Sequence, residues 1–315
     1  MGARQAWRSA AETWRSCDRP VRAARALSNA LSGGPPDATG SALLAGVLQD
    51  VGELMAARSA AADAVDAATE LPARVLALDV SIGVHLLLGE VDQARTLLGV
   101  LKALGLPAAQ VAAAFRGARL QRLDGLLDAG IGVLEGVVDG LPAADRRFAA
   151  PRAAALQEIA EYQLLAGRID SARAAHGAAT ATWARSGRRP GGFAAEGLGV
   201  RIQLACAEPV LPSLLDNGIA FATDRGLPLL GAELRIARGR ARVAADVPGA
   251  SEDFDAAVQA GITSGAPLLE GRARLWRRVA GCPAADGDLA TTRLRLAPDR
   301  ILSRHTALWP DSRNS

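Results

Sequence analysis

One short phrase occurs twice in this chain, each time directly after a leucine-rich stretch. Its copies are Gly89–Arg95 (GEVDQAR) and Gly167–Arg173 (GRIDSAR). The glycine at the start of the phrase tolerates the left-handed backbone that ends a helix. The aspartate can accept hydrogen bonds from the free N–H groups of a following helix and favours its positive end. The phrase therefore predicts a helix–turn–helix unit, and a unit that repeats constrains the fold of the whole chain.

Five weaker copies of the phrase extend this repeat along the chain. A small residue near the end of each copy marks its register, at intervals of 33, 37, 36, 42, 41 and 37 residues. Such an interval fits one helical hairpin made of two helices of about 14–18 residues. We expect the small side chain to let the two helices of a hairpin cross closely. The marker residues are Ala24, Ala57, Ala94, Gly130, Ala172, Ser213 and Ala250.

The composition favours helices over strands. Apolar residues make up 50% of the chain and aromatic residues only 3%, and much of the apolar content is alanine, the best intrinsic helix former. Valine and isoleucine occur singly, without the alternating runs that strands need. We therefore predict an all-α protein, a right-handed α-solenoid of about seven antiparallel helical hairpins.

The breaks in the pattern predict how the chain is organised. Residues 1–280 form the repeat array, and the longest loop signal inside it, RRPGG, indicates a slight hinge near residues 187–193. Residues 281–315 change in character because Pro283, Gly287, Pro298 and Pro310 interrupt them. We expect one capping helix around residues 289–296, followed by an irregular tail.

The phrase, together with a small residue seven positions before the turn glycine at Ala45, Ala118 and Ala160, resembles the tetratricopeptide repeat. The resemblance covers about residues 5–280 and implies a helical binding scaffold. The periods exceed the ~34 residues usual in that family, and leucine, glutamine or alanine fills most of its aromatic positions. The lysine/asparagine clamp with which some members hold a peptide's terminal carboxylate is missing. Longer repeats rich in alanine and arginine resemble the helical array of large bacterial LuxR-type ATP-dependent regulators.

Charge and cysteine content exclude several classes of protein. Only one of the 36 basic residues is a lysine, and the net charge of +3 is too low to indicate binding to nucleic acid. The 3 cysteines have no zinc or disulfide spacing, so we expect reduced thiols. We find no secretory signal and no run of the ~20 apolar residues that a membrane helix needs. We therefore expect a cytoplasmic protein that binds neither a membrane nor nucleic acid.

The motifs of common enzyme classes are missing. The sequence contains neither a P-loop nor a Gly-x-Ser-x-Gly elbow. His85, His176 and His305 lie far apart and lack the spacing of metal ligands, so we interpret His85 and His176 as packing residues. We therefore predict that the protein is not an enzyme and has no catalytic residue, cofactor or metal site.

Three polar groups leave alternatives open. Glu158 and Glu161, next to Tyr162, have the one-turn spacing of an acid–base pair, but no histidine or second carboxylate pair matches them. A basic helix at the N-terminus could touch a membrane or nucleic acid, and a second basic cluster could bind an acidic partner. We favour a solvated helix face for the carboxylates and for the N-terminal arginines, with the two N-terminal tryptophans in the core of the first hairpin, and binding of an acidic partner by the second cluster is the less favoured alternative. The basic groups are Arg4, Arg8 and Arg15 beside Trp7 and Trp14, and Arg272, Arg274, Arg277 and Arg278 around Trp276.

These observations predict a non-enzymatic scaffold. Stacked hairpins curve and expose a groove lined by the first helix of each hairpin. We expect this groove to bind a protein partner, or a small-molecule effector, in bacterial signalling or regulation. The alternative is the sensor array of a LuxR-type transcriptional regulator without its ATPase and DNA-binding modules. The expected groove residues are Arg119, Gln121, Gln157, Glu161, Arg201 and Arg235.

Overall fold

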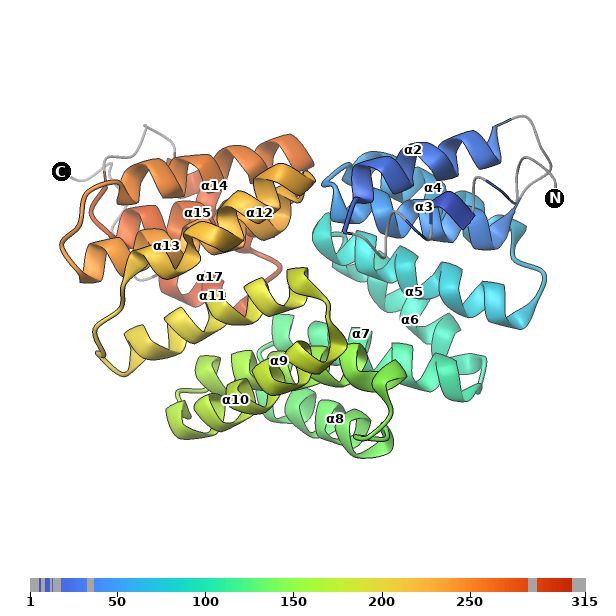
Figure 1. The fold of residues 1–315 in the computed structure, drawn as a ribbon, viewed down its shortest axis with the longest axis horizontal. Helices are drawn as coiled ribbons and strands as arrows, with labels where there is room; N and C mark the ends of the chain where they lie inside the picture. The colour runs from blue at the N-terminus through green and yellow to red at the C-terminus, as the bar shows by residue number, and fades with distance from the viewer. Residues whose placement is uncertain are drawn as a thin grey trace. The chain divides into compact units, whose positions relative to one another are not determined.

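A computed structural model describes residues 6, 9–11, 13, 18–32, 37–282 and 288–307 of the chain. Every regular element in these ranges is helical, which confirms the predicted all-α class (Figure 1). Two of the elements are short 3₁₀ turns, η1 (Arg146–Phe148) and η2 (Pro212–Leu215). The α-helices are α2 (Pro20–Leu31), α3 (Ala38–Asp50), α4 (Leu54–Ala67), α5 (Leu71–Leu87), α6 (Val91–Ala103), α7 (Pro107–Leu123), α8 (Leu127–Gly140), α9 (Ala149–Leu165), α10 (Ile169–Ser186), α11 (Arg189–Ala205), α12 (Asp216–Arg225), α13 (Pro228–Ala244), α14 (Ala250–Ser264), α15 (Pro267–Val279), α16 (Asp288–Leu296) and α17 (Arg300–Ala307).

The turns of the predicted repeat are residues with a left-handed backbone. Those at the predicted turns recur at intervals of 34, 37, 36, 42, 40, 39 and 35, and five further glycines with a positive φ lie between them. At three of these turns the left-handed residue is not glycine, so the phrase is hard to read in the sequence there. We call the helix before each of these turns a first helix and the helix after it a second helix. The turn residues are Asp18, Gly52, Gly89, Gly125, Gly167, Ala207, Asp246 and Gly281.

Two backbone hydrogen bonds close these turns. At Gly89, the glycine N–H donates to Leu86 (3.2 Å) and the N–H of Glu90 donates to His85 (2.9 Å). The same two bonds recur around Gly167. This pattern is the Schellman motif, which satisfies the last carbonyl groups of a helix. The predicted role of glycine in the phrase is therefore confirmed.

The prediction that the aspartate of the phrase makes a capping hydrogen bond is wrong. The N-cap residues of α6, α8 and α10 lie two positions earlier, and their side chains make no capping hydrogen bond. The aspartates lie in the first turn of these helices, where a carboxylate still favours the positive end of the helix dipole. They are Asp92 in α6, Asp128 in α8 and Asp170 in α10.

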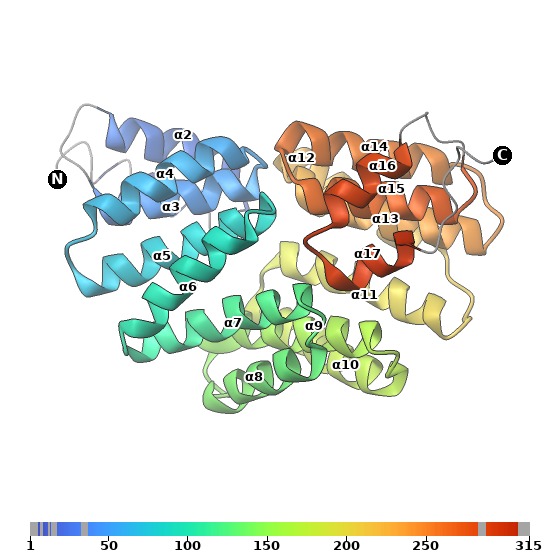
Figure 2. The same cartoon turned by 180° about the vertical axis from the view of Figure 1, so that it is seen from behind.

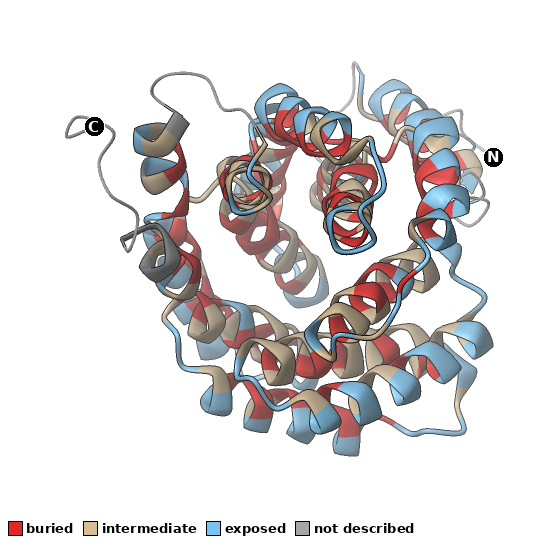
Figure 3. Cartoon of the chain, turned by 90° about the vertical axis from the view of Figure 1, so that its left-hand side faces the viewer, coloured by how far each residue is buried: buried red, intermediate tan, exposed pale blue. Residues whose placement is uncertain are grey.

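Small residues between paired helices are buried, as the repeat pattern predicts. Ala57, Ala94 and Ala172 are fully inaccessible to solvent, and a side chain at Gly130 would overlap the ring of Tyr162. Three of the seven markers depart from this pattern, because Ala24 and Ala250 are only half-buried and Ser213 lies exposed in η2 rather than between two helices. Figure 3 shows that buried residues lie on the sides where helices meet and that exposed residues lie on the outward sides.

Contacts divide the chain into two compact units. The first contains residues 1–116, 221–229 and 263–266, and the second contains the remainder. Within the first unit, α3 packs against α2, α4 and α5, and α5 packs against α6 (Figure 1). Within the second, α9 packs against α8, α10 and α11 (Figure 2). The proposed hinge at residues 187–193 lies inside the second unit and stays a prediction.

The predicted capping helix corresponds to α16, and a further helix, α17, follows it. Leu296 at the end of α16 is fully buried. Asp299 begins α17, since its Oδ1 atom accepts hydrogen bonds from the N–H groups of Ile301 and Leu302, both at 3.1 Å. This cap explains why α17 forms so soon after a proline. The rest of the predicted tail, residues 308–315, lies outside the described residues.

The left-handed turn glycine should be more sensitive to substitution than a glycine inside a helix. We expect Gly167→Ala to lower the free energy of unfolding by about 1–2 kcal/mol, because a Cβ atom disfavours the left-handed backbone. Gly177, exposed within α10, is the matched control, and neither glycine has a neighbour that a Cβ atom would meet. Gly177→Ala should raise stability by about 0.5–1 kcal/mol through helix propensity. Urea unfolding measures both, and an equal effect of the two substitutions would contradict this assignment.

Candidate functional site

Ion pairs join successive first helices at intervals that match the repeat. Asp79 on α5 pairs with Arg116 on α7 (2.8 Å), and 37 residues separate them. The other pairs join residues 39, 40 and 39 positions apart. We call these four pairs the first-helix ladder. The remaining three are Arg119–Glu158 (2.5 Å, α7 to α9), Glu161–Arg201 (3.2 Å, α9 to α11) and Glu233–Arg272 (α13 to α15).

The ladder is half-buried, so its charges differ from ordinary surface charges. The side chain of Glu158 is 13% exposed and that of Arg201 is 21% exposed. Burial alone would raise the pKa of Glu161, but the guanidinium groups of Arg201, Arg122 and Arg272 outweigh it and lower that pKa to about 2. The carboxylate is therefore charged at neutral pH. Partial burial also strengthens the pair relative to one in bulk water.

Arg122 and Asp299 form a buried pair beside the ladder. Their atoms Nη1 and Oδ2 lie 3.0 Å apart, and the Asp299 side chain is 1% exposed. Burial disfavours the charged guanidinium, but Asp299 and Glu161 outweigh it and raise the pKa of Arg122. Asp299 thus caps α17 and also binds it to α7. This pair is not predictable from the sequence, because nothing local links residues so far apart.

The structure places three of the six expected groove residues in the ladder: Arg119, Glu161 and Arg201. The other three lie elsewhere. Gln157 accepts a hydrogen bond from the indole N–H of Trp183 (2.8 Å), which joins α9 to α10. The Gln121 Oε1 atom is buried and has no hydrogen-bond partner among the described residues. Arg235 interacts electrostatically with Arg238 and Asp253.

The interpretation of Glu158, Glu161 and Tyr162 as a solvated helix face is wrong. Tyr162 is only 1% exposed, and burial, followed by the charge of Glu158, raises the pKa of its hydroxyl. This hydroxyl lies 3.3 Å from Glu158, to which it donates a hydrogen bond. Gly130 on α8 leaves the space that the ring fills. The two carboxylates pair with arginines of neighbouring first helices, and this arrangement builds the ladder.

The expected basic cluster on α15 does not form a single patch. Arg274 pairs with Glu270 of the same helix (3.0 Å), and Arg277 pairs with Asp255 of α14 (3.0 Å). Arg272 belongs to the ladder. The other expected basic group, around Trp7 and Trp14, lies outside the described residues.

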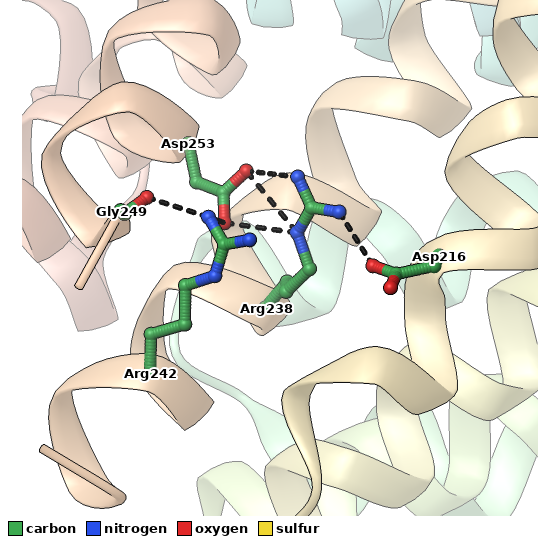
Figure 4. Close-up of polar contacts among 5 residues, drawn as sticks. All are labelled: Asp216, Arg238, Arg242, Gly249 and Asp253. Atoms are coloured by element: carbon green, nitrogen blue, oxygen red, sulfur yellow. Dashed lines mark hydrogen bonds and ion pairs between the residues drawn. The ribbon is translucent and has the colours of Figure 1, made fainter. Parts of the chain in front are cut away.

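A buried ion network joins α12, α13 and α14 (Figure 4). Asp253 accepts hydrogen bonds from Arg238 (2.6 and 3.0 Å) and Arg242 (2.9 Å). Arg238 also reaches Asp216 at 2.6 Å, and Arg242 donates to the carbonyl of Gly249 at 2.7 Å. The side chain of Asp253 is 3% exposed. These contacts satisfy the carboxylate within the protein, so we interpret the network as structural.

A cavity of about 560 Å³ lies beside the irregular repeat of α11 and α12. There η2 follows the turn at Ala207 and delays the start of α12. Ligand pockets usually measure about 300–1,000 Å³. Burial lowers the pKa of His176 and raises that of Glu196, both of which line the cavity. The remaining lining residues are Arg173, Phe193, Gly199, Val200, Ile202, Gln203, Glu208, Leu214, Leu215 and Asn217.

His176 should make stability depend on pH. Because burial lowers its pKa in the folded state, the unfolded chain binds a proton more readily, at about pH 6.5. The contribution of the neutral ring is therefore fully present above about pH 6.5 and declines as the pH falls towards the lower, folded pKa. We expect His176→Gln to lose less stability than the unsubstituted protein between about pH 7 and 5.5. Parallel curves for the two proteins, measured by urea unfolding, would contradict this.

The described residues contain no group of three or more His, Cys, Asp or Glu side chains that could hold a metal ion. No helix among them is both long and apolar enough to span a membrane. Comparisons with protein-family models and with curated protein sequences found no match for this chain.

Proposed function

We propose that this chain is a tetratricopeptide-like, non-enzymatic binding module that holds a protein partner along its first helices. We infer a right-handed array of about seven hairpins, in keeping with the recurrence of left-handed turns. The observation that carries the proposal is the first-helix ladder. Repeat arrays bind through the surface that their equivalent helices share, and the ladder sets charged groups in a fixed order on such helices. The resemblance to arrays of LuxR-type regulators stays a prediction.

Binding of the partner is expected to depend on the ladder and not on the second helices. We would capture partners from a bacterial lysate with the unsubstituted chain and with an Arg119→Ala/Arg201→Ala variant. Arg95→Ala on α6 is the matched control, because Arg95 also pairs with a carboxylate, at 2.9 Å, and is 44% exposed. Proteins retained by the control and lost by the ladder variant would support the proposal. The same captured set with all three chains, or no captured protein, would overturn it.

The cavity supports a second candidate function, the binding of a small-molecule effector. Its volume suits such a ligand, and the buried Nδ1 atom of His176 has no partner among the described residues. Fragments that bind there should shift the ring signals of His176 in NMR spectra. Asn217→Trp should narrow the cavity and reduce these shifts. Fragment shifts that stay the same in this variant would place the fragments elsewhere.

A further inference from the structure

The first-helix ladder lacks a carboxylate at one position. Arg201 on α11 pairs with Glu161 on α9. The residue 39 positions after Arg201, at the interval that separates two other pairs of the ladder, is Arg240 on α13. The position next to Arg201 on the following first helix therefore holds a second guanidinium and no acid. Like charges at neighbouring positions repel one another.

Arg240 lies against an aromatic ring. Its guanidinium carbon lies 3.6 Å from the ring centre of Trp276 on α15. No carboxylate pairs with Arg240 in the part of the chain that the structure describes. Burial, and then the charge of Arg201, lower its pKa to about 9. A half-buried charge without a partner destabilises a fold unless something compensates it.

Stacking on Trp276 does not satisfy the N–H donors of Arg240. An arginine carries five N–H donors in the plane of its guanidinium group, and contact with an aromatic face uses none of them. Trp276 thus fixes the orientation of the group, while its donors need an acceptor. Anions that present several oxygen atoms fit this planar edge best.

A third guanidinium adds to the positive potential. Arg272 interacts electrostatically with Arg201 and with Arg122, and burial lowers its pKa to about 10 despite its carboxylate neighbours. Arg201 pairs with Glu161 and Arg272 pairs with Glu233, whereas no carboxylate acts on Arg240 among the described residues, so one positive charge is in excess. The charges of the four ladder pairs are already compensated, so the single excess charge favours one anionic group over a long acidic polymer.

We propose that Arg201 and Arg240 bind the phosphoryl group of a small molecule, with Arg272 as a supporting charge. A phosphoryl group offers three oxygen atoms and about two negative charges to the two guanidinium groups. A single carboxylate offers fewer oxygen atoms and less negative charge. This inference rests on the proposed function, because it assigns a ligand chemistry to the same first-helix face.

Isothermal titration calorimetry with inorganic phosphate and with pyrophosphate tests the proposal, at constant ionic strength so that screening does not change. We expect both to bind, and Arg240→Gln to raise the dissociation constant about tenfold or more, as for the loss of a charge-assisted contact. Arg147→Gln is the control, because Arg147 is 84% exposed and paired with Asp145. Citrate distinguishes phosphoryl from carboxylate recognition.

Arg240→Glu provides a second test that does not depend on loss of function. The new carboxylate should pair with Arg201 and complete the ladder. We expect this variant to melt at a higher temperature than the unsubstituted chain and to be insensitive to phosphate. Equal phosphate binding by the unsubstituted chain and Arg240→Gln, binding of citrate alone, or no binding of either phosphate would overturn the inference. The partner-capture experiment uses the Arg119→Ala/Arg201→Ala variant in phosphate-free buffer. Its outcome therefore does not depend on whether phosphate binds.

Discussion

Asp253→Ala is expected to lower the free energy of unfolding by about 3–5 kcal/mol, the usual cost of breaking a buried ion pair by removing one partner. The Asp253 carboxylate accepts hydrogen bonds from both Arg238 and Arg242. Alanine would leave the two guanidinium groups half-buried beside one another. Arg238 would keep only Asp216, whose side chain is 55% exposed and compensates it less well.

Glu252 is the matched control for this prediction. It lies in the same first turn of α14 but is exposed, so Glu252→Ala should change stability by less than about 0.5 kcal/mol. Because repeat arrays can unfold in parts, hydrogen exchange should accompany urea unfolding. In Asp253→Ala, hydrogen exchange should become faster for the amides of α13 and α14 than for amides elsewhere in the chain, each compared with the unsubstituted protein. A stability loss below about 1 kcal/mol would show that the network is not structural.

The sequence was sufficient to predict the helical class and most of the turns, because both depend on local chemistry. Gly52, Gly89, Gly125 and Gly167 have the left-handed backbone that the phrase implies. The copies without glycine were read less accurately. Their left-handed residues are Asp18, Ala207 and Asp246, and at such positions the neighbouring helices, rather than the residue itself, determine the backbone conformation.

The site was only partly predictable, because its contacts are long-range. The repeat pattern was sufficient to place Glu161 and Arg201 on first helices, but it did not predict that they pair. It could not indicate that Gln157 points to Trp183 instead, since that depends on the rotation of α9 against α10. The pairing of Arg122 with Asp299 depends on the position of α17, and no copy of the repeated phrase predicts that helix.

A second large effect is expected at Tyr162. Tyr162→Ala is expected to lower the free energy of unfolding by about 3–5 kcal/mol, the range found for deleting a buried aromatic side chain. The Tyr162 side chain is among the largest that are fully buried in the described part of the chain. Tyr162→Phe should cost only about 1 kcal/mol, because it removes one long hydrogen bond to Glu158 and keeps the ring.

Gly130 allows this prediction to be tested as a pair. A Cβ atom at Gly130 would lie 2.9 Å from the ring of Tyr162, so Gly130→Ala should destabilise the unsubstituted chain by about 1–3 kcal/mol through overpacking. In the Tyr162→Ala background the ring is gone, and the same substitution should be neutral or stabilise α8 through helix propensity. A double-mutant cycle by urea unfolding measures the coupling. Additive effects would mean that the space at Gly130 does not position Tyr162, and that the adjacent carboxylates of the ladder owe their places to other contacts.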